Sequence, residues 1–354
     1  YSTAMGYFAL GSQNFTSGTD AYNTAIGYVA GGSVTTGVQN TLIGSEAGDA
    51  LTVGVRNVAV GFDSLSSDTQ GSKSIAIGRS ALATQNFTSA TDAYNVAVGD
   101  YAGAFVTTGT NNTLIGGLAG SALTTGANNT FVGVSAGGVG VVTGNSNNCV
   151  GVGALQSLTS GANNSTLGDS AGTSVNTGSN NLLLGHDAGR TGSPGGNVTA
   201  GSNVIVLGDE NITSAQIKVD WTVVSDARDK TDFTALDLGL DFVNALAPVT
   251  YKWDMRSKYG DKSAEGYDLA AQTPDGTHKE DWLDIGFKAQ DVEALEIAAG
   301  YKIADKTNLT TSLTSDGQQM GLQYSKFVPI LVKAIQEQQA LIVELEARLS
   351  ALEV

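Results

Sequence analysis

A short repeating unit dominates residues 1–208. Each unit contains an apolar tripeptide followed by glycine, as in Thr41-Leu42-Ile43-Gly44. Most anchor glycines are 17 residues apart, as from Gly27 to Gly44, and two early steps, which end at Gly27 and Gly99, are 21 residues long. The anchor glycines are Gly6, Gly27, Gly44, Gly61, Gly78, Gly99, Gly116, Gly133, Gly151, Gly168, Gly185 and Gly208. Such a unit is too short for a helical pair and lacks helical periodicity. The chain is therefore predicted to stack short coils.

The composition of each unit indicates β-structure. Besides β-branched residues, the units contain turn glycines and asparagine pairs such as Asn111-Asn112 and Asn128-Asn129. This pattern predicts a strand, a turn and a second short strand in each coil of a β-solenoid. We expect the asparagines to satisfy neighbouring turns rather than to bind ligands. Twelve rungs spaced about 4.8 Å apart would give an array about 55–60 Å long.

A line of small residues follows the anchor glycines. Three positions after the glycine comes a small residue, often followed by glycine; examples are Ala47-Gly48, Ala119-Gly120, Ala136-Gly137, Ala171-Gly172 and Ala188-Gly189. Small side chains at the same position of successive units imply that backbones approach closely there. Two interpretations remain open: a tight corner within one chain, or the three-fold axis of a homotrimer.

Both steps of 21 residues contain nearly the same insertion, which indicates an internal duplication. The insertion from Gln13 to Asn23 recurs as the segment from Gln85 to Asn95. Aromatic faces and carboxylates suit sugar binding, and loops on a rigid scaffold often carry binding sites. The candidate glycan contacts are Phe15, Asp20, Tyr22, Phe87, Asp92 and Tyr94. The alternative is a longer turn capped by its own aromatic residues.

Composition excludes several classes of function. The 46 glycines are concentrated before Ser225, where 38 of them lie. The net charge is −16, which disfavours binding to nucleic acid. With one cysteine, Cys149, and two histidines, His186 and His278, we expect no disulfide, no metal site and no cofactor. No apolar run is long enough for membrane insertion. Because the chain starts at Tyr1 within a repeat, we expect it to be a fragment of a longer protein.

From Ser225 onward the sequence resembles an ordinary globular domain. The segment 236–246 is apolar but irregular, 248–253 alternates as a strand, and 254–283 is predicted to be a surface excursion. Residues 284–293 predict a strand that leads into a short helix. Near the end, residues spaced alternately three and four apart predict a coiled coil, with Ser325 as the helix cap. All but Gln338 are apolar, and the seam is Val328, Leu331, Ile335, Gln338, Ile342, Leu345, Leu349 and Leu352. The alternative is an amphipathic helix packed on its own domain.

The hexapeptide Ser225-Asp226-Ala227-Arg228-Asp229-Lys230 lies at the boundary between these two compositions. A serine hydroxyl becomes a nucleophile when a base removes its proton, and lysine is a base only as the neutral amine. Arg228 is a possible source of positive charge that favours that form. Asp226 and Asp229 would oppose this effect if they were close and ionised, so they must point away or orient hydrogen-bond donors. The alternative is a polar turn or a helix start with Ser225 as N-cap.

Three motifs after the boundary resemble the intramolecular chaperone, auto-processing domain of bacteriophage tailspikes and endosialidases. They are the hexapeptide 225–230, Gly286-Phe287-Lys288-Ala289-Gln290-Asp291-Val292, and Tyr324 to Pro329 leading into Ala334 to Glu337. The resemblance implies a domain that trimerises, winds three fibre strands together and then releases itself. It also implies that Ser225 is the nucleophile, Lys230 the base and Val224–Ser225 the scissile bond. The β-branched residues before the bond, up to Val224, are expected to slow attack sterically.

The repeats resemble the head repeats of trimeric autotransporter adhesins and the glycine-rich shafts of phage tail fibres. The sequence therefore predicts a mostly β chain: a trimeric Gly-rich β-solenoid shaft (1–210), a connecting strand (211–224), a small α+β chaperone domain (225–322) and a trimeric coiled coil (323–354). We expect a homotrimeric virion tail fibre or tailspike, made in the host cytoplasm, that contacts other tail proteins and a host glycan or protein receptor.

The predicted enzymatic activity is that of an autocatalytic serine endopeptidase, which cuts its own chain in a single turnover. Glycosidase activity is not expected, because no acid pair converges in the repeats. The alternative function is a non-cleaving surface adhesin or capsid fibre, in which the carboxy-terminal unit is only a trimerisation clamp.

Overall fold

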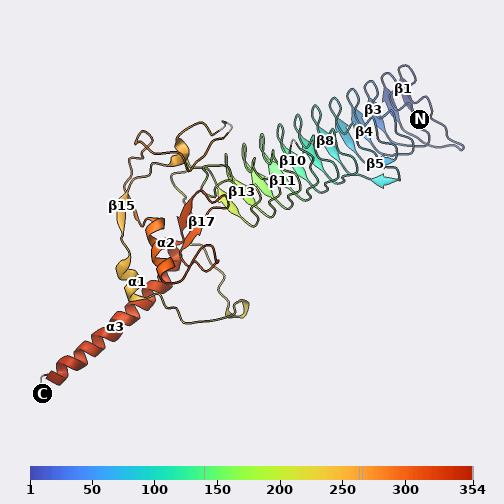
Figure 1. The fold of residues 1–354 in the computed structure, drawn as a ribbon. Coiled ribbons are helices and arrows are strands. Elements are labelled where there is room, and N and C mark those ends of the chain that lie inside the picture. Colours follow the sequence, from blue (N-terminus) through green and yellow to red (C-terminus); the bar gives the residue numbers. More distant parts are fainter. Residues whose placement is uncertain (139, 263, 265, 353–354) are drawn as a thin grey trace. The chain divides into compact units, whose positions relative to one another are not determined.

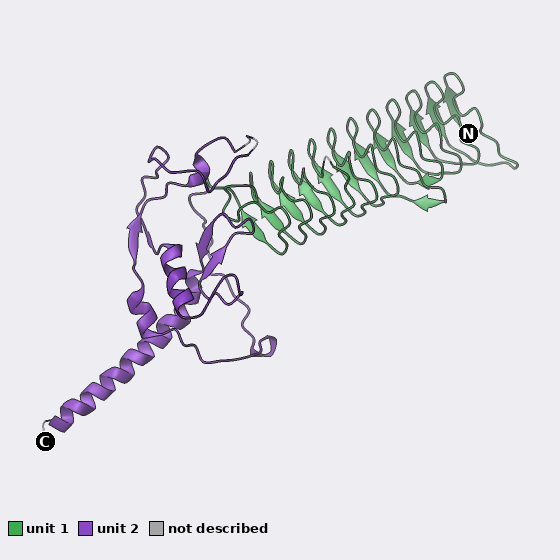
Figure 2. Ribbon diagram, in the orientation of Figure 1, with its two compact units in different colours: residues 1–211 green, residues 212–354 purple. Residues whose placement is uncertain are grey.

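The structure, a computed structural model, describes residues 1–138, 140–262, 264 and 266–352. The chain divides into two compact units, Tyr1–Asn211 and Ile212–Val354, which are coloured separately in Figure 2. The first unit contains the repeats, and the second contains the globular sequence. The boundary between the units therefore lies before Ser225, at the start of the segment that was expected to connect them.

The first unit is a β-solenoid built on one parallel sheet of twelve strands (Figure 1). Each coil contributes three residues to it, and equivalent residues of successive coils pair in register, as in Leu114↔Phe131. The strands are β1 (Thr3–Met5), β2 (Thr24–Ile26), β3 (Thr41–Ile43), β4 (Val58–Val60), β6 (Ile75–Ile77), β8 (Val96–Val98), β9 (Thr113–Ile115), β10 (Thr130–Val132), β11 (Asn148–Val150), β12 (Ser165–Leu167), β13 (Leu182–Leu184) and β14 (Ile205–Leu207). The predicted solenoid is confirmed.

The expectation of a second strand in every coil is wrong for most coils. Among the described residues it appears only as the pair β5 (Gly71–Ser72) and β7 (Thr91–Asp92) and as a bridge between Leu123 and Val142. Elsewhere the coil turns through residues with positive φ, such as Asn111 (58°) and Leu118 (60°). A strand needs extended backbone, so these left-handed residues interrupt it.

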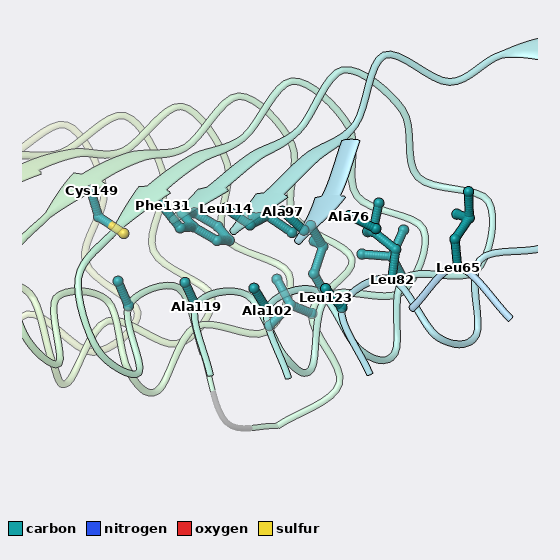
Figure 3. Packing of buried hydrophobic residues seen from close by; sticks show 14 of the residues in the cluster. Leu65, Ala76, Leu82, Ala97, Ala102, Leu114, Ala119, Leu123, Phe131 and Cys149 are labelled. Carbon is teal, nitrogen blue, oxygen red and sulfur yellow. The ribbon is translucent and has the colours of Figure 1, made fainter. Parts of the chain in front are cut away.

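The small-residue line faces the core of the same chain. The alanines of this line are fully buried although only one chain is present; they are Ala47, Ala119, Ala136, Ala171 and Ala188. Figure 3 shows Ala102 and Ala119 across the interior from the strand residues Ala97, Leu114 and Phe131. The line is therefore the tight corner of one chain, and the alternative of a three-fold axis is wrong. One chain closes its own core.

A ladder of buried asparagines joins the coils. Asn112 donates through Nδ2 to the carbonyl of Gly126 (3.0 Å) and accepts at Oδ1 from the backbone N–H of Asn129 (3.0 Å). Equivalent bonds to a glycine carbonyl are made by Asn23, Asn40, Asn57, Asn95, Asn112, Asn129, Asn147, Asn164 and Asn181. The first residue of most asparagine pairs, such as Asn111, takes the left-handed conformation that asparagine tolerates. The expected structural role of the asparagines is confirmed.

The anchor glycines form a second ladder in which a side chain has no room. Gly116 has a φ of +132°, and a Cβ added to it would lie 2.6 Å from the carbonyl oxygen of Gly133. Its neighbour Gly117 has no atom within 4 Å of such a Cβ. These adjacent glycines therefore differ in backbone conformation and in space, and only Gly116 belongs to the repeated anchor position.

We predict that Gly116→Ala destabilises the solenoid by about 2–4 kcal/mol, because the substitution combines backbone strain with a backbone clash. The matched control Gly117→Ala should change the stability by less than about 0.5 kcal/mol. Urea unfolding of each full-length variant, followed by circular dichroism at the β-sheet minimum, measures both. Equal losses of stability in the two variants would contradict the assigned ladder.

The second unit is a small α+β domain with a long terminal helix (Figure 1). Its elements are α1 (Leu240–Ala245), β15 (Val249–Tyr251), β16 (Asp284–Gly286), α2 (Ala289–Ala298), β17 (Thr311–Leu313), β18 (Met320–Leu322) and α3 (Phe327–Leu352), with 3-10 turns at Ala227–Asp229, Arg256–Lys258 and Tyr324–Lys326. Strands β15 and β16 pair antiparallel, as do β17 and β18. The strand predicted over 248–253 and the strand–helix segment predicted over 284–293 are confirmed.

A compact apolar core holds this unit together; it comprises Leu238, Phe242, Val292, Phe327 and Ile330. The core joins α1, α2 and the first turns of α3. At its side, the buried carboxylate of Glu296 accepts hydrogen bonds from the hydroxyls of Thr310 and Thr311. Burial alone would raise the pKa of Glu296, but these donors and the backbone N–H groups hold it below its usual value.

Two local expectations differ from the structure. Residues 211–224, expected to be a connecting strand, contain no strand, because no neighbouring strand in this chain pairs with them. Ser325, expected to cap the terminal helix, lies within the 3-10 turn Tyr324–Lys326 instead, and α3 begins at Phe327. Pro329 still falls in the first turn of α3, where its missing N–H costs no helical bond.

Candidate active site

The hexapeptide at the boundary folds into a tight polar turn. Residues Ala227–Asp229 form a single 3-10 turn, and the cap is Asp226, whose Oδ1 accepts from the backbone N–H of Arg228 (2.9 Å). The turn closes when the backbone N–H of Lys230 donates to the carbonyl of Ala227 (3.3 Å). The alternative in which Ser225 is the N-cap is therefore wrong, because aspartate at the next position takes that role. The hydroxyl of Ser225 is left to make another contact.

That contact is with Lys230. The Nζ atom of Lys230 lies 2.5 Å from Oγ of Ser225 and donates to it. The turn between them brings the two side chains together although they are separated along the sequence. The structure thus juxtaposes a hydroxyl and an amine in the geometry that proton transfer between them requires.

Asp226 and Arg228 pair with each other beside this contact. The guanidinium Nη2 of Arg228 lies 2.6 Å from Oδ2 of Asp226, and Nε also contacts the carboxylate. The hydrogen bonds from Arg228 lower the pKa of Asp226, and the same pairing raises the pKa of Arg228. The charge of Arg228 is therefore largely balanced by its neighbour, and Asp226 is engaged in the turn.

Both sides of the Val224–Ser225 bond are open to solvent in the single chain. The side chain of Val224 is 80% exposed, and Ser225 and Lys230 are also exposed. Burial favours the neutral form of a lysine, which is the form that accepts a proton. The chain thus brings a serine hydroxyl and a lysine amine together at an exposed turn.

The second candidate glycan loop is internally paired. Asp92 forms an ion pair with Lys73 (2.6 Å), and Lys73 also donates to the hydroxyl of Tyr94 (2.8 Å). The hydrogen bond from Lys73 lowers the pKa of Asp92, and the bond to Asp92 raises the pKa of Lys73. Phe87 is only 7% exposed, so its proposed glycan contact is corrected: this ring is buried in the coil.

The first copy of the loop leaves its polar groups open. Asp20 and Tyr22 are exposed, Phe15 is partly buried, and the ring of Tyr22 stacks on Tyr1 with centroids 5.8 Å apart. Tyr1 occupies in the first copy the position that Lys73 has in the second, so the two copies differ in the partner of their tyrosine. The sequence interpretation missed Lys73, although alignment of the two copies identifies it. Glycan contact at Asp20, Tyr22 and Phe15 stays a prediction.

Two further searches concern metals and membranes. In the described part of the chain, no three side chains of histidine, cysteine, aspartate or glutamate converge as metal ligands. No helix within the same residues has the length and apolar character to cross a bilayer. Cys149 is buried in the solenoid, and burial raises the pKa of its thiol strongly.

The geometry agrees with a comparison to protein families. Residues 225–301 match a peptidase family described as chaperone of endosialidase. The match begins at Ser225 and covers the serine–lysine pair, α1, α2 and the β15–β16 sheet. It does not extend to the motif at 324–337. No curated protein and no solved structure matches the chain. The carboxy-terminal unit thus carries an endosialidase-type chaperone domain behind a β-solenoid, and this family implies self-cleavage.

Proposed function

We propose that this chain is a phage tail fibre or tailspike protein whose carboxy-terminal domain assembles three copies and then cuts the Val224–Ser225 bond. The observation that carries the proposal is the 2.5 Å contact between Lys230 Nζ and Ser225 Oγ, at the first residue of the family match. The solenoid is the durable product, and the chaperone domain is released after use.

The chemistry follows from the position of Ser225 next to the scissile bond. Neutral Lys230 accepts the proton of Ser225 Oγ, and Oγ bonds to the carbonyl carbon of Val224. The bond from that carbon to the nitrogen of Ser225 then breaks, and Lys230 returns the proton to the leaving amine. Water hydrolyses the resulting ester, which yields the carboxylate of Val224 and a free Ser225. Because both reactants belong to one chain, their effective concentration is high and one turnover suffices.

The terminal helix supports assembly of several copies. The helix contacts its own domain through the buried residues Phe327, Ile330 and Ala334, which lie outside the predicted seam. The apolar seam residues remain exposed, with exposed fractions from 41% to 84%; they are Val328, Leu331, Ile335, Ile342, Leu345, Leu349 and Leu352. A heptad seam left open on a helix favours a coiled coil with other copies over packing on the same domain.

The outer face of the solenoid sheet also favours association. The third residue of every strand points outward, is apolar and is not buried; the row is Met5, Ile26, Ile43, Val60, Ile77, Val98, Ile115, Val132, Val150, Leu167, Leu184 and Leu207. No charged residue occupies an outward position of this sheet. A face about 55 Å by 10 Å on each of two chains amounts to roughly 1,100 Å², which clears the roughly 1,000 Å² expected of a biological interface.

Assembly also supplies what the active site lacks in a single chain. Lys230 is exposed, and a lysine base requires burial or nearby positive charge. A neighbouring copy that covers the turn would provide this burial only after the trimer has formed. Cleavage is therefore timed to follow assembly, which is the order a removable chaperone needs.

The shaft and the family support a role in the virion. A rigid solenoid suits a spacer between tail proteins and a host surface, and its loops suit contact with a host glycan or protein receptor. The exposed Asp20 and Tyr22 are the strongest candidates for that contact. This assignment places the mature protein in the phage tail after synthesis in the host cytoplasm.

Expression of the full chain tests the proposal. Denaturing electrophoresis should separate two fragments, and native mass measurement should give three copies of the larger one. A single intact chain that is trimeric would instead support the non-cleaving adhesin or capsid fibre with a clamp domain. An intact monomer would contradict both functions.

A further inference from the structure

We propose that residues 217–223 form a strand only between copies of the chain, and that this strand positions the Val224–Ser225 bond for cleavage. The inference rests on the proposed function, because it names the segment through which assembly reaches the scissile bond. Its partners are the same residues of the two other copies.

The sequence of the segment has the period of a half-buried strand. Apolar residues at Ile217, Val219, Trp221 and Val223 alternate with polar residues at Lys218, Asp220 and Thr222. Side chains two residues apart lie on one face of a strand, so the four apolar residues share a face. β-Branched and aromatic residues favour strands, and residues 209–238 contain neither glycine nor proline.

The single chain leaves this apolar face without a partner. The exposed fractions are 58% for Ile217, 73% for Val219, 77% for Trp221 and 76% for Val223. No residue from 211 to 224 is in a strand, so the segment lacks pairing along its backbone as well. Contiguous exposed apolar side chains of this size mark an interaction surface.

Charge complementarity points to a second copy as the partner. Two parallel copies in full register would place Lys218 beside Lys218, which is unfavourable. A shift of two residues keeps the apolar face on the same side and places Lys218 of one copy opposite Asp220 of the next. In three copies wound together with this stagger, the paired charges of Lys218 and Asp220 lie outside. The apolar side chains on the face of Trp221 are enclosed between the copies. The segment also leads directly to Ser225, where the proposed trimer already brings three copies together.

The position of the segment links this pairing to cleavage. Val223 is followed by the carbonyl-bearing residue Val224, and the turn of Ser225 begins immediately after it. Extended backbone fixed up to Val223 restricts the direction of the Val224 carbonyl relative to Ser225 Oγ. An unpaired segment leaves that carbonyl free to rotate, so the pair of Ser225 and Lys230 attacks it less often.

Cross-linking tests the pairing in the uncut Ser225→Ala chain. With a shift of two residues, Val219 of one copy lies opposite Trp221 of the next, so the double variant Val219→Cys/Trp221→Cys should form a disulfide between copies under a mild oxidant and give a covalent dimer on a non-reducing denaturing gel. Trp221→Cys alone should give little dimer, because the shift separates equivalent residues by about 7–8 Å, and the parent chain should give none because Cys149 is buried. Equal dimer yields from the double variant and from Trp221→Cys alone, or no dimer from the double variant in a trimeric chain, would overturn the pairing.

Cleavage rates test the coupling. Val219→Asn places an amide on the apolar face and should slow cleavage at least tenfold, whereas Thr222→Asn places the same group outside and should leave the rate within twofold. Normal cleavage of Val219→Asn would overturn the inference and leave the proposed function standing. If the wild-type chain stayed uncut while the cysteine double variant still cross-linked, the cleavage step and the coupling would be refuted, but not the strand.

Discussion

Ser225→Ala is expected to leave the chain uncut, so that a denaturing gel shows one band of 354 residues in place of two. The substitution removes the only hydroxyl that the 2.5 Å contact places against Lys230 Nζ. Loss of a catalytic nucleophile lowers rates by about 10⁴- to 10⁶-fold. No cleavage should therefore be detectable on the time scale of a routine expression. The hydroxyl is exposed and makes no other described bond, so folding and assembly should be unchanged.

Two substitutions at Lys230 separate its role as a base from its role as a charge. Lys230→Met removes the amine, and Lys230→Arg keeps a cation that does not release its proton. Both should block cleavage as Ser225→Ala does. Lys252→Met, another exposed lysine in the same domain, is the matched control and should cleave normally. Cleavage at the usual bond in Lys230→Arg would show that the site needs only positive charge there.

The second large effect concerns the terminal helix. Ile342→Asp puts a carboxylate into the exposed seam of α3, and burying three such charges in a coiled coil costs several kcal/mol for each group. We expect this variant to be monomeric by light scattering at micromolar concentration and to cleave at least 100-fold more slowly. The solenoid signal in circular dichroism should persist, because the first unit closes its own core.

Val343→Asp is the control for that experiment. Val343 is 54% exposed on the same helix, next to the seam residue but outside the seam. It should remain trimeric and cleave at the wild-type rate. If monomeric Ile342→Asp cleaved as fast as this control, cleavage would not depend on assembly, and the explanation for the exposed Lys230 would be wrong.

The shaft was largely predictable because its signal is repeated in every coil. The register of the strands follows from the anchor glycines, and the asparagine ladder follows from the asparagine pairs. The missing second strand was not predictable, because bulky residues such as Phe8 (φ 56°) and Val29 (φ 56°) take left-handed backbone against their own preference. The stacking of neighbouring coils imposes that conformation, and no local pattern records it.

The candidate site was predictable in its residues but not in its local structure. The spacing of Ser225 and Lys230 and the family motifs identified the pair, whereas the cap at Asp226 and the pairing of Asp226 with Arg228 are properties of the folded turn. Burial of Phe87 likewise depends on packing between coils, so the sequence did not reveal that this ring is unavailable for glycan contact. The exposure of residues 217–223 is visible only in the folded chain.

The amino-terminal residue of the smaller fragment tests the central claim most directly. Intact-mass measurement and amino-terminal sequencing of freshly expressed wild-type chain should identify Ser225 as that residue, with Val224 at the carboxy terminus of the larger fragment. A cut at any other bond, or cleavage that persists at this bond in both Ser225→Ala and Lys230→Met, would contradict the account.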